Sequence, residues 1–389
     1  MSLISSGINA KLNSTGQALT RLFCVFILGV VLSTQVKAAP VTVTDIVGRK
    51  VTLSQPLERF VMSEGRYVMA LALVRPGNPV SGLKGMMQPV SWAYPKLEKQ
   101  VFERFPEAKD IALFGANDQS SLSVEKLIDL KPEAAIFGIQ DHGPGSKNKE
   151  LLDQLQAAGI KVIFIDFRMD PLHNTLPSLK ILSQLFASEQ HAKKYIDFYQ
   201  KKRDHIAATV ANTKTKPGVF LQAHPGRFDC CVGMADGMLG PFVGFAGGNN
   251  IADAVAPGPV SKHTMEFLLV EDPDVWIGTA SASPDDFAKG QNGVTLGLGV
   301  DRATAQKSLD QYLSSKEFQA LTAVQKKRAH AIWHNFYNSP LNIVVLDAFA
   351  RWIHPELFPD LDPEHTMSTI FAQYLPFDWS GSATSTNSR

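Results

Sequence analysis

A phrase that occurs twice in the sequence constrains the fold more than any other feature. Each copy has a hydroxyl residue two positions before a glutamate, a proline seven positions after that glutamate, and then an apolar run. The residues are Ser123, Glu125, Pro132 and 134–139 in the first copy, and Thr264, Glu266, Pro273 and 275–278 in the second. A hydroxyl side chain caps the first turn of a helix, and proline does not continue one. We therefore predict two short helices, each followed by a buried strand, in two similar α/β lobes.

Length and composition agree with two lobes and exclude some classes of function. The chain has 389 residues, which is more than one ordinary core accommodates. Hydrophobic residues make up 44% and charged residues 19%, so the chain is not disordered. Its formal net charge of +1 gives no basic field for nucleic acid. We expect no nucleic-acid partner and look for a local binding site.

The N-terminal segment has the pattern of a signal peptide. A lysine and an arginine precede the apolar stretch 22–32, and the small residues Ala38 and Ala39 follow it. A membrane anchor is the alternative, but this stretch is shorter than the roughly 20 apolar residues that span a bilayer. We predict export, with residues 1–39 removed as a signal peptide.

The exported chain would keep two cysteines, the neighbours Cys230 and Cys231. In an oxidising compartment such neighbours either join in a strained ring or stay reduced in a buried place. A vicinal disulfide would present a rigid apolar surface in a pocket, whereas two thiols would act as small core residues. The sequence leaves both alternatives open.

A long helical region separates the two copies of the repeated phrase. Apolar residues keep helical spacing from about 175 to 210, with an interruption near 187–189, and no Gly- or Ser-rich linker is present. Two alternating runs around Gly48 predict a hairpin over 41–53. We divide the exported chain into an N-terminal lobe (40–188), a joining helix (189–211), a C-terminal lobe (212–379) and a tail (380–389) that we expect to be disordered.

Several polar and aromatic residues follow predicted strands, and α/β sheets bind ligands beyond the carboxyl ends of their strands. The strands concerned are predicted at 59–62, 80–85, 219–222 and 329–333. The candidates for ligand contact are Arg66, Tyr67, Trp92, His224, Arg227, Trp333, His334 and Tyr337. The alternative for each is a solvated charge or a packed aromatic side chain.

Catalytic and metal-binding motifs are absent from the sequence. It contains no His-Glu-x-x-His, no Gly-x-Ser-x-Gly and no zinc-type cysteine spacing. His224, His334, Asp229 and the two cysteines could converge on a metal, but their spacing does not show it. The arginine, histidine and aromatic side chains among the candidates are better suited to binding a large, partly anionic ligand than to catalysing its cleavage. We expect a binding protein without an intrinsic cofactor rather than an enzyme.

Several phrases in order along the chain resemble a known family. They are 43–53, 59–61, 123–133, 159–163 and 264–274. Together they look like the periplasmic binding proteins that feed ferric-siderophore, haem and cobalamin ABC importers. The resemblance implies a monomer with two Rossmann-like lobes joined by a single long α-helix, and a ligand held in the cleft. By motif position it also implies that Glu125 and Glu266 dock onto a permease dimer at the inner membrane.

Within that family resemblance, we hypothesise that the cargo is a ferric siderophore. Arg66, Arg227 and Arg302 would oppose its charge, and the rings of Trp92, Trp333 and Tyr337 would pack against its organic shell. Haem or cobalamin is the alternative within the family, and the candidate axial ligands for haem are Tyr67, His224, His334 and Tyr337. An exported, two-lobed metal-dependent enzyme is the alternative of another class.

Overall fold

The computed structural model describes residues 40–116, 119–228, 230–254 and 258–388. The predicted signal peptide at 1–39 lies outside this range. Among the described residues, no helix combines the length and apolar character needed to cross a bilayer.

The N-terminal lobe contains a hairpin and a parallel sheet. Strands β1 and β2 pair antiparallel, as predicted for 41–53. The sheet has the strand order β5-β4-β3-β6-β7, and all its neighbours are parallel. The strands are β1 (Val41–Thr44), β2 (Lys50–Leu53), β3 (Phe60–Met62), β4 (Leu83–Met86), β5 (Ala112–Leu113), β6 (Ala134–Gly138) and β7 (Lys161–Ile165). The helices are α1 (Val68–Val74), α2 (Pro95–Arg104), α3 (Val124–Asp129), α4 (Lys149–Ala157) and α5 (Pro171–Leu185).

Both faces of this sheet are buried because its apolar side chains alternate between two clusters. Ile136 and Ile163 belong to the large cluster that includes α1 and α5, whereas Phe137 and Phe164 belong to the cluster that includes residues of α3 and α4. Successive side chains of a strand point to opposite faces, so near-continuous apolar runs fill both layers. The sheet therefore holds the loops at its strand ends on a rigid base.

The C-terminal lobe has a mixed sheet of the order β11-β9-β8-β12-β14-β16, with β10 also paired to β8. Strands β8, β12 and β14 are parallel neighbours at its centre. Its strands are β8 (Gly218–Ala223), β9 (Val232–Met234), β10 (Asn249–Asn250), β11 (Val260–Lys262), β12 (Val275–Ala280), β14 (Ala329–Trp333) and β16 (Thr384–Thr386), and β13 (Gly297–Leu298) pairs with β15 (Gly381–Ser382). Its helices are α7 (Gly240–Phe245), α8 (Met265–Glu271), α9 (Pro284–Ala288), α10 (Arg302–Tyr312), α11 (Lys316–Ala320), α12 (Thr322–Gln325), α13 (Ile343–Ile353) and α14 (Pro363–Tyr374).

The repeated phrase forms the predicted helix and strand in both lobes. The Ser123 side chain accepts a hydrogen bond from the backbone of α3, and Thr264 does the same for α8. Leu127 and Leu268 occupy equivalent positions of these helices, and both are fully buried. The strands that follow are β6 and β12, each paired on both sides with parallel neighbours. The predicted two-lobed α/β class is confirmed.

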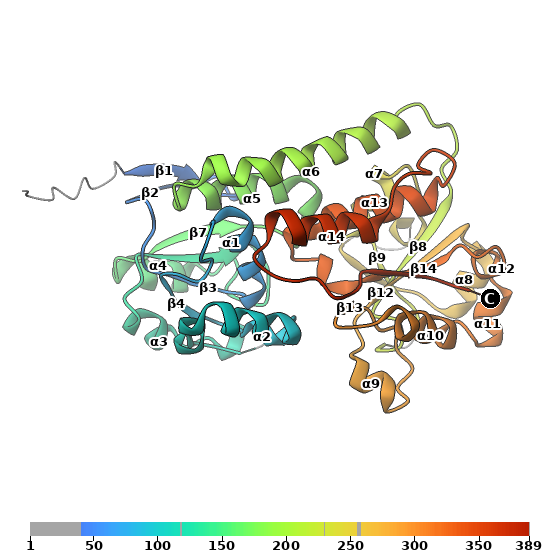
Figure 1. The fold of residues 1–389 in the computed structure, drawn as a ribbon, viewed down its shortest axis with the longest axis horizontal. Helices are drawn as coiled ribbons and strands as arrows, with labels where there is room; N and C mark the ends of the chain where they lie inside the picture. Colours follow the sequence, from blue (N-terminus) through green and yellow to red (C-terminus); the bar gives the residue numbers. More distant parts are fainter. Residues whose placement is uncertain (1–39, 117–118, 229, 255–257, 389) are drawn as a thin grey trace, which may run out of the picture. The chain divides into compact units, whose positions relative to one another are not determined.

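Helix α6 (Glu189–Val210) contacts elements of both lobes (Figure 1). It packs against α1 and α5 on one side and lies along α13 on the other. The hydroxyl of Tyr195 donates to the carbonyl of Pro340 at 2.7 Å, and Lys202 forms an ion pair with the buried Asp347 at 2.7 Å. The predicted interruption before this helix is present, since α5 ends at Leu185 and Ala187 has a φ of 49°.

The C-terminal tail corrects one prediction. Residues 380–389 were expected to be disordered, but β16 pairs antiparallel with β14 and completes that edge of the sheet. Ala383 is fully buried, and the Ser388 hydroxyl donates to Asp310 at 2.5 Å. The Gly-, Ser- and Thr-rich tail resembles a linker in composition, yet the free edge of β14 supplies backbone partners that composition does not reveal.

Candidate functional site

The loops at the carboxyl ends of the central strands carry most of the predicted contact residues. In the N-terminal lobe these loops follow β3, β4, β6 and β7, and in the C-terminal lobe they follow β8, β12 and β14. Two hydrogen bonds join the lobes nearby: the Tyr94 hydroxyl donates to the Asn335 carbonyl at 3.1 Å, and the Asn335 side chain donates to the Ala93 carbonyl at 2.8 Å. Residues of both lobes therefore lie around one region.

Arg66 is the centre of the N-terminal part of the site. Its side chain is almost fully buried and donates to Glu64, with 2.7 Å between Nη2 and Oε2. Its guanidinium lies 4.9 Å from the ring centres of both Trp92 and Tyr337. His142 completes the cluster, because its Nδ1 lies 2.7 Å from Glu64 Oε1. Arg66 thus links the loops after β3, β4 and β6 to the loop after β14.

Charge pairing keeps this buried cluster ionised. Burial would raise the pKa of Glu64, but Arg66 and His142 outweigh that effect and lower it to about 2. Burial alone would lower the pKa of Arg66. The attraction of the Glu64 carboxylate outweighs this effect of burial, so the pKa of the guanidinium lies above its usual value. The pair is therefore charged at neutral pH.

Tyr67 is buried beside the Arg66 cluster. Its hydroxyl donates to Asp141 at 2.8 Å, and the Ser63 hydroxyl donates to the same carboxylate oxygen at 2.6 Å. Burial, followed by the nearby Asp141 carboxylate, raises the pKa of Tyr67 well above its usual value. Its side chain holds the loops after β3 and β6 together in the core, which leaves it no free hydroxyl for a ligand.

His224 and His334 form the part of the site that belongs to the C-terminal lobe. They directly follow β8 and β14, the strands on either side of β12. Their ring centres lie 3.8 Å apart. His224 Nδ1 lies 2.7 Å from the Ser281 hydroxyl, and His334 Nδ1 lies 2.9 Å from the Thr279 hydroxyl. Burial lowers the pKa of His224 to about 4, with a smaller effect from Arg227. Burial and then His224 also lower the pKa of His334 well below its usual value, so both imidazoles are neutral at pH 7.

Three arginines surround this histidine pair. Besides His224, the charges that lower the pKa of His334 are Arg66, Arg227 and Arg168. Arg168 lies 5.9 Å from the ring centre of Tyr337, and its Nε is buried without a hydrogen-bond partner. Arg227 and Arg168 form no ion pair with any carboxylate in the described part of the chain. Two of the three arginines at the site therefore have no ion-pair partner in the described ranges.

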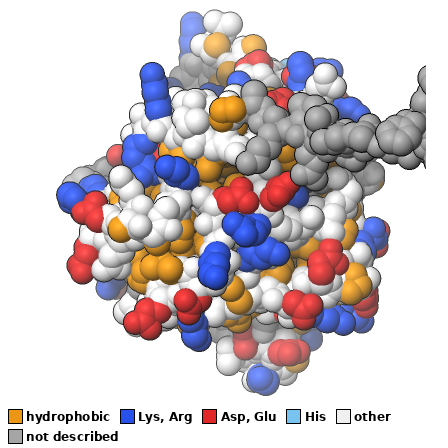
Figure 2. Space-filling view, turned by 90° about the vertical axis from the view of Figure 1, so that its left-hand side faces the viewer, with side chains coloured by type: hydrophobic (Ala, Val, Ile, Leu, Met, Phe, Trp, Pro, Cys, Tyr) orange, Lys and Arg blue, Asp and Glu red, His pale blue; other side chains and the backbone are white. Residues whose placement is uncertain are grey.

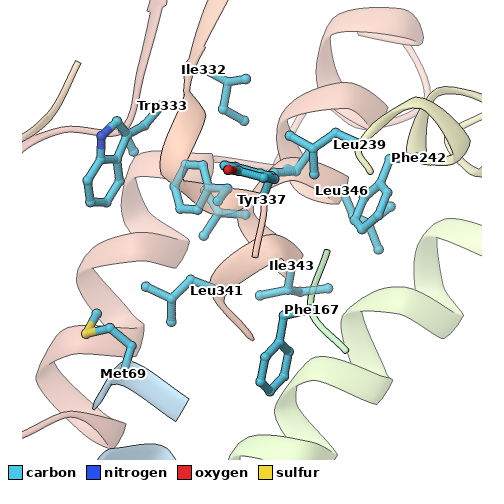
Figure 3. Packing of buried hydrophobic residues seen from close by; sticks show 14 of the residues in the cluster. Met69, Phe167, Leu239, Phe242, Ile332, Trp333, Tyr337, Leu341, Ile343 and Leu346 are labelled. Carbon is cyan, nitrogen blue, oxygen red and sulfur yellow. The ribbon is translucent and has the colours of Figure 1, made fainter. Parts of the chain in front are cut away.

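Two other predicted contacts lie elsewhere. Arg302 is the exposed first residue of α10, and the carboxylate it acts on is Glu364 of α14. Trp333, one of the buried residues labelled in Figure 3, is only 7% exposed. Its ring packs against Tyr94 and Trp379. Arg302 therefore acts on another helix and the ring of Trp333 packs in the core, and contact of either with a ligand stays a prediction.

Residues that the sequence reasoning missed have a common signal. Glu64, Asp141, His142 and Arg168 all lie within a few residues of the carboxyl end of β3, β6 or β7. The same positional rule that selected Arg66 would have selected them. In the structure, Glu64 neutralises the buried Arg66, and Asp141 accepts hydrogen bonds from buried hydroxyls.

The adjacent cysteines lie in the loop after β8. The sulfur atoms of Cys230 and Cys231 adjoin each other, which is compatible with the first of the two alternatives, and the vicinal disulfide stays a prediction. Cys231 exchanges two backbone hydrogen bonds of 2.8 Å with His263, the residue before the N-cap of α8. These bonds anchor the two cysteines next to that helix. Within the ranges that the structure covers, no group of three or more His, Cys, Asp or Glu side chains is arranged to hold a metal ion.

Glu125 and Glu266 lie at equivalent positions of the two lobes. Each lies in the first turn of its helix, α3 or α8, and each is exposed. The helix dipole stabilises an acidic residue in the first turn, so the stability of the helix alone also explains why a glutamate is found there. Leu269 and Val270 are exposed next to Glu266 on α8, with 81% of Val270 accessible.

A sequence model of one family matches residues 93–332, and that family is described as periplasmic binding protein. The match covers more than half of the chain. The chain belongs to the periplasmic binding protein family. Members of this family bind solutes for transport. Comparison with curated protein sequences gives no significant match.

Solved periplasmic binding proteins share the fold over most of the chain. The TroA-like periplasmic binding protein FepB from Veillonella parvula is 23% identical, with a TM-score of 0.77 over 90% of this chain and 100% of that one. The molybdate-binding MolA of Haemophilus influenzae is 16% identical, with a TM-score of 0.61 over 88% and 99%. A haem-binding protein from Pseudomonas aeruginosa is 17% identical, with a TM-score of 0.52 over 77% and 94%. Because these cargoes differ, the fold alone does not identify a ligand.

Proposed function

We propose that this protein captures an anionic iron chelate, a ferric siderophore, in the region between its lobes and delivers it to an ABC permease at the inner membrane. The observation that carries the proposal is the set of three arginines around a neutral histidine pair, with aromatic rings beside them. The predicted signal peptide and the family membership support a periplasmic location.

The charges of the site support an anionic cargo. One of the three arginines, Arg66, has a carboxylate partner in Glu64, whereas Arg168 and Arg227 have none among the described residues. A buried Nε of Arg168 without a partner is a donor that an anionic ligand can satisfy. Negative groups of the cargo would therefore replace water around these guanidinium groups.

The aromatic residues of the site support an organic shell around the metal. Trp92 is 39% exposed and lies edge-on to His142, with the Arg66 guanidinium over its ring. Tyr337 lies beside His334 and within reach of two arginines. Flat rings backed by cations bind flat, electron-rich groups well. On the face of the N-terminal lobe seen in Figure 2, basic and acidic side chains are interspersed.

Haem is the second candidate, and the neutral histidine pair is the observation that favours it. His224 and His334 have the protonation state that an axial ligand needs. Tyr67, the other axial candidate in the first lobe, is bonded to Asp141. The two proposals differ in their absorbance, because haem gives a Soret band and a ferric chelate gives a broad visible charge-transfer band.

The test is native mass spectrometry, with an absorbance spectrum, of protein isolated from the periplasm of the cell that makes it. We expect one iron chelate per chain and a broad charge-transfer band. A Soret band with a haem-sized mass increment would replace the ferric chelate by haem. Steady conversion of a bound molecule to product would instead identify an enzyme and contradict the transport proposal.

A further inference from the structure

The C-terminal segment after α14 contacts both lobes. It leaves α14 at Tyr374, runs without helix or strand through 375–380, and returns to the C-terminal lobe as β15 and β16 (Figure 1). Those two strands pair with β13 and β14. Both ends of the irregular stretch therefore belong to the C-terminal lobe, whereas its middle contacts α2 of the N-terminal lobe. We call residues 375–388 the strap.

The polar contacts between the strap and α2 converge on Asp378. The Gln100 side chain donates to the Asp378 carbonyl at 3.0 Å and accepts the Asp378 backbone N–H at 2.7 Å. Arg104 lies about one turn further along α2, and its Nη2 lies 2.6 Å from Asp378 Oδ2. Gln100 satisfies both backbone groups of one residue, as a neighbouring strand would, and so fixes this irregular stretch to the helix.

Apolar contacts attach the same stretch to both lobes. Phe377 is 3% exposed, and its ring lies edge-on to Phe105 at the end of α2, with 6.4 Å between the ring centres. Trp379 packs against Trp333 and Phe371 of the C-terminal lobe. An exposed ion pair contributes little by itself, so the burial of Phe377 carries much of the attachment to α2.

One stripe of α2 faces the C-terminal lobe. Lys96, Gln100 and Arg104 are spaced four residues apart and therefore lie on the same side of the helix. Lys96 packs along Gly299, where an added Cβ atom would lie 3.1 Å from its Cγ. The Gly299 N–H in turn donates to the Ser380 carbonyl at 2.6 Å. The stripe therefore follows the strap and the loop that is bonded to it.

Helix α2 also holds the turn that contains Trp92. Tyr94 is the N-cap residue of α2, and its hydroxyl donates to the Asn335 carbonyl of the C-terminal lobe. The Glu98 side chain accepts the Ser91 backbone N–H at 2.9 Å, which ties the turn at 90–92 to the helix. A shift of α2 would therefore move Trp92.

We propose that the strap holds α2 against the C-terminal lobe and thereby fixes Trp92 in the site, with Gln100 and Phe377 as positioning residues. The contacts run from the strap to α2, from α2 to the turn at 90–92, and from Trp92 to the guanidinium of Arg66. The strap is then a second connection between the lobes besides α6. This role goes beyond the proposed function, because it concerns the geometry of the site and holds for any cargo.

The test is ¹⁹F NMR of the purified protein labelled with 5-fluorotryptophan. The chain has five tryptophans, and single Trp→Phe variants assign their signals. In the double variant Gln100→Ala with Arg104→Ala, we expect the Trp92 signal to shift and broaden, while the signals of the buried Trp276 and Trp352 stay unchanged. Hydrogen exchange of the α2 backbone amides should become about tenfold faster, because the helix loses its hydrogen bonds to the strap.

The matched control is the double variant Lys99→Ala with Glu103→Ala. It removes two exposed side chains of α2 at the same spacing and breaks an ion pair that lies within the helix. It should leave both the Trp92 signal and the exchange of α2 unchanged.

A second variant tests the apolar attachment. Phe377→Ala should shift the Trp92 signal in the same direction as the Gln100 and Arg104 variant, whereas Phe377→Leu should keep it close to the wild-type position, because leucine retains much of the buried apolar area. Thermal unfolding of each variant shows whether it is folded. The double variant on the surface of α2 keeps the test valid if Phe377→Ala does not fold.

Two results would overturn the inference. One is an unchanged Trp92 signal with unchanged exchange of α2 in the Gln100 and Arg104 variant. The other is an equal change in the control, which would show that the stability of α2 itself, rather than its attachment to the strap, sets the position of Trp92. Either result leaves the proposed transport of an iron chelate standing, whereas that proposal fails separately if native protein from the periplasm carries no metal chelate.

Discussion

Replacement of Glu64 by glutamine is expected to lower the free energy of unfolding by about 3–5 kcal/mol, the usual cost of removing one charged partner from a buried ion pair. Glu64 is fully buried and Arg66 is 2% exposed, so the variant would leave a charged guanidinium without its carboxylate. Urea unfolding at pH 7 measures the loss. A double variant, Glu64→Gln with Arg66→Met, should recover most of it, because no unpaired charge stays buried.

The control for this prediction is Asp197→Asn on α6, which breaks the exposed pair with Lys193 and should cost less than about 1 kcal/mol. The pH profile gives a second readout. The pKa of Glu64 is lowered from 4.5 to about 2, so its contribution is complete above pH 4.5 and is lost as the pH falls towards 2. If Glu64→Gln costs no more than Asp197→Asn, the buried pair does not hold the site together.

Replacing Glu125 and Glu266 together by alanine is expected to reduce uptake of the cargo to background while leaving the affinity of the binding protein unchanged. Each carboxylate is exposed on a different lobe, at equivalent positions of α3 and α8. Two such charges would set the orientation of the protein on a two-fold permease and raise the association rate. Uptake is measured in cells that depend on the importer, and affinity is measured on the purified variant.

A matched control is available because other helices also begin with an exposed glutamate. Glu150 of α4 and Glu317 of α11 lie in first turns, one in each lobe. The double variant Glu150→Ala with Glu317→Ala removes the same charge from both lobes and should leave uptake intact. Equal loss of uptake in the two double variants would show that net charge, rather than these two positions, matters. A loss of affinity in the first variant would reject the docking role.

The repeated phrase was the most reliable part of the sequence because its signals are local. A capping hydroxyl, a buried leucine and a following proline act within one helix, so α3 and α8 could be predicted residue by residue. The tail failed for the opposite reason: its strand β16 exists because the edge of β14 is open, and that partner lies more than fifty residues earlier. Pairing at such a distance leaves no local pattern.

The site was predicted only in part, because the position of a residue after a strand is a local signal and the direction of its side chain is not. The rule of strand ends found Arg66, His224, His334 and Tyr337, which the structure brings together. It could not separate Trp333, whose ring turns into the core, from its neighbour His334. Arg302 was selected by charge alone, and its place at the start of α10 directs it to Glu364. Residue type suggests chemistry, whereas the direction of a side chain depends on packing that only the folded chain shows.

The most direct test of the central claim compares two ferric chelates that differ in charge and leave the same positions of iron open. A tetradentate bis-catecholate complex is negatively charged, and a tetradentate bis-hydroxamate complex is positively charged. Quenching of tryptophan fluorescence during titration gives both affinities, since Trp92 lies at the site. We predict that the negative complex binds about 100-fold more tightly, and that Arg168→Gln with Arg227→Gln removes this preference. Equal affinities, or tighter binding of the positive complex, would contradict the account.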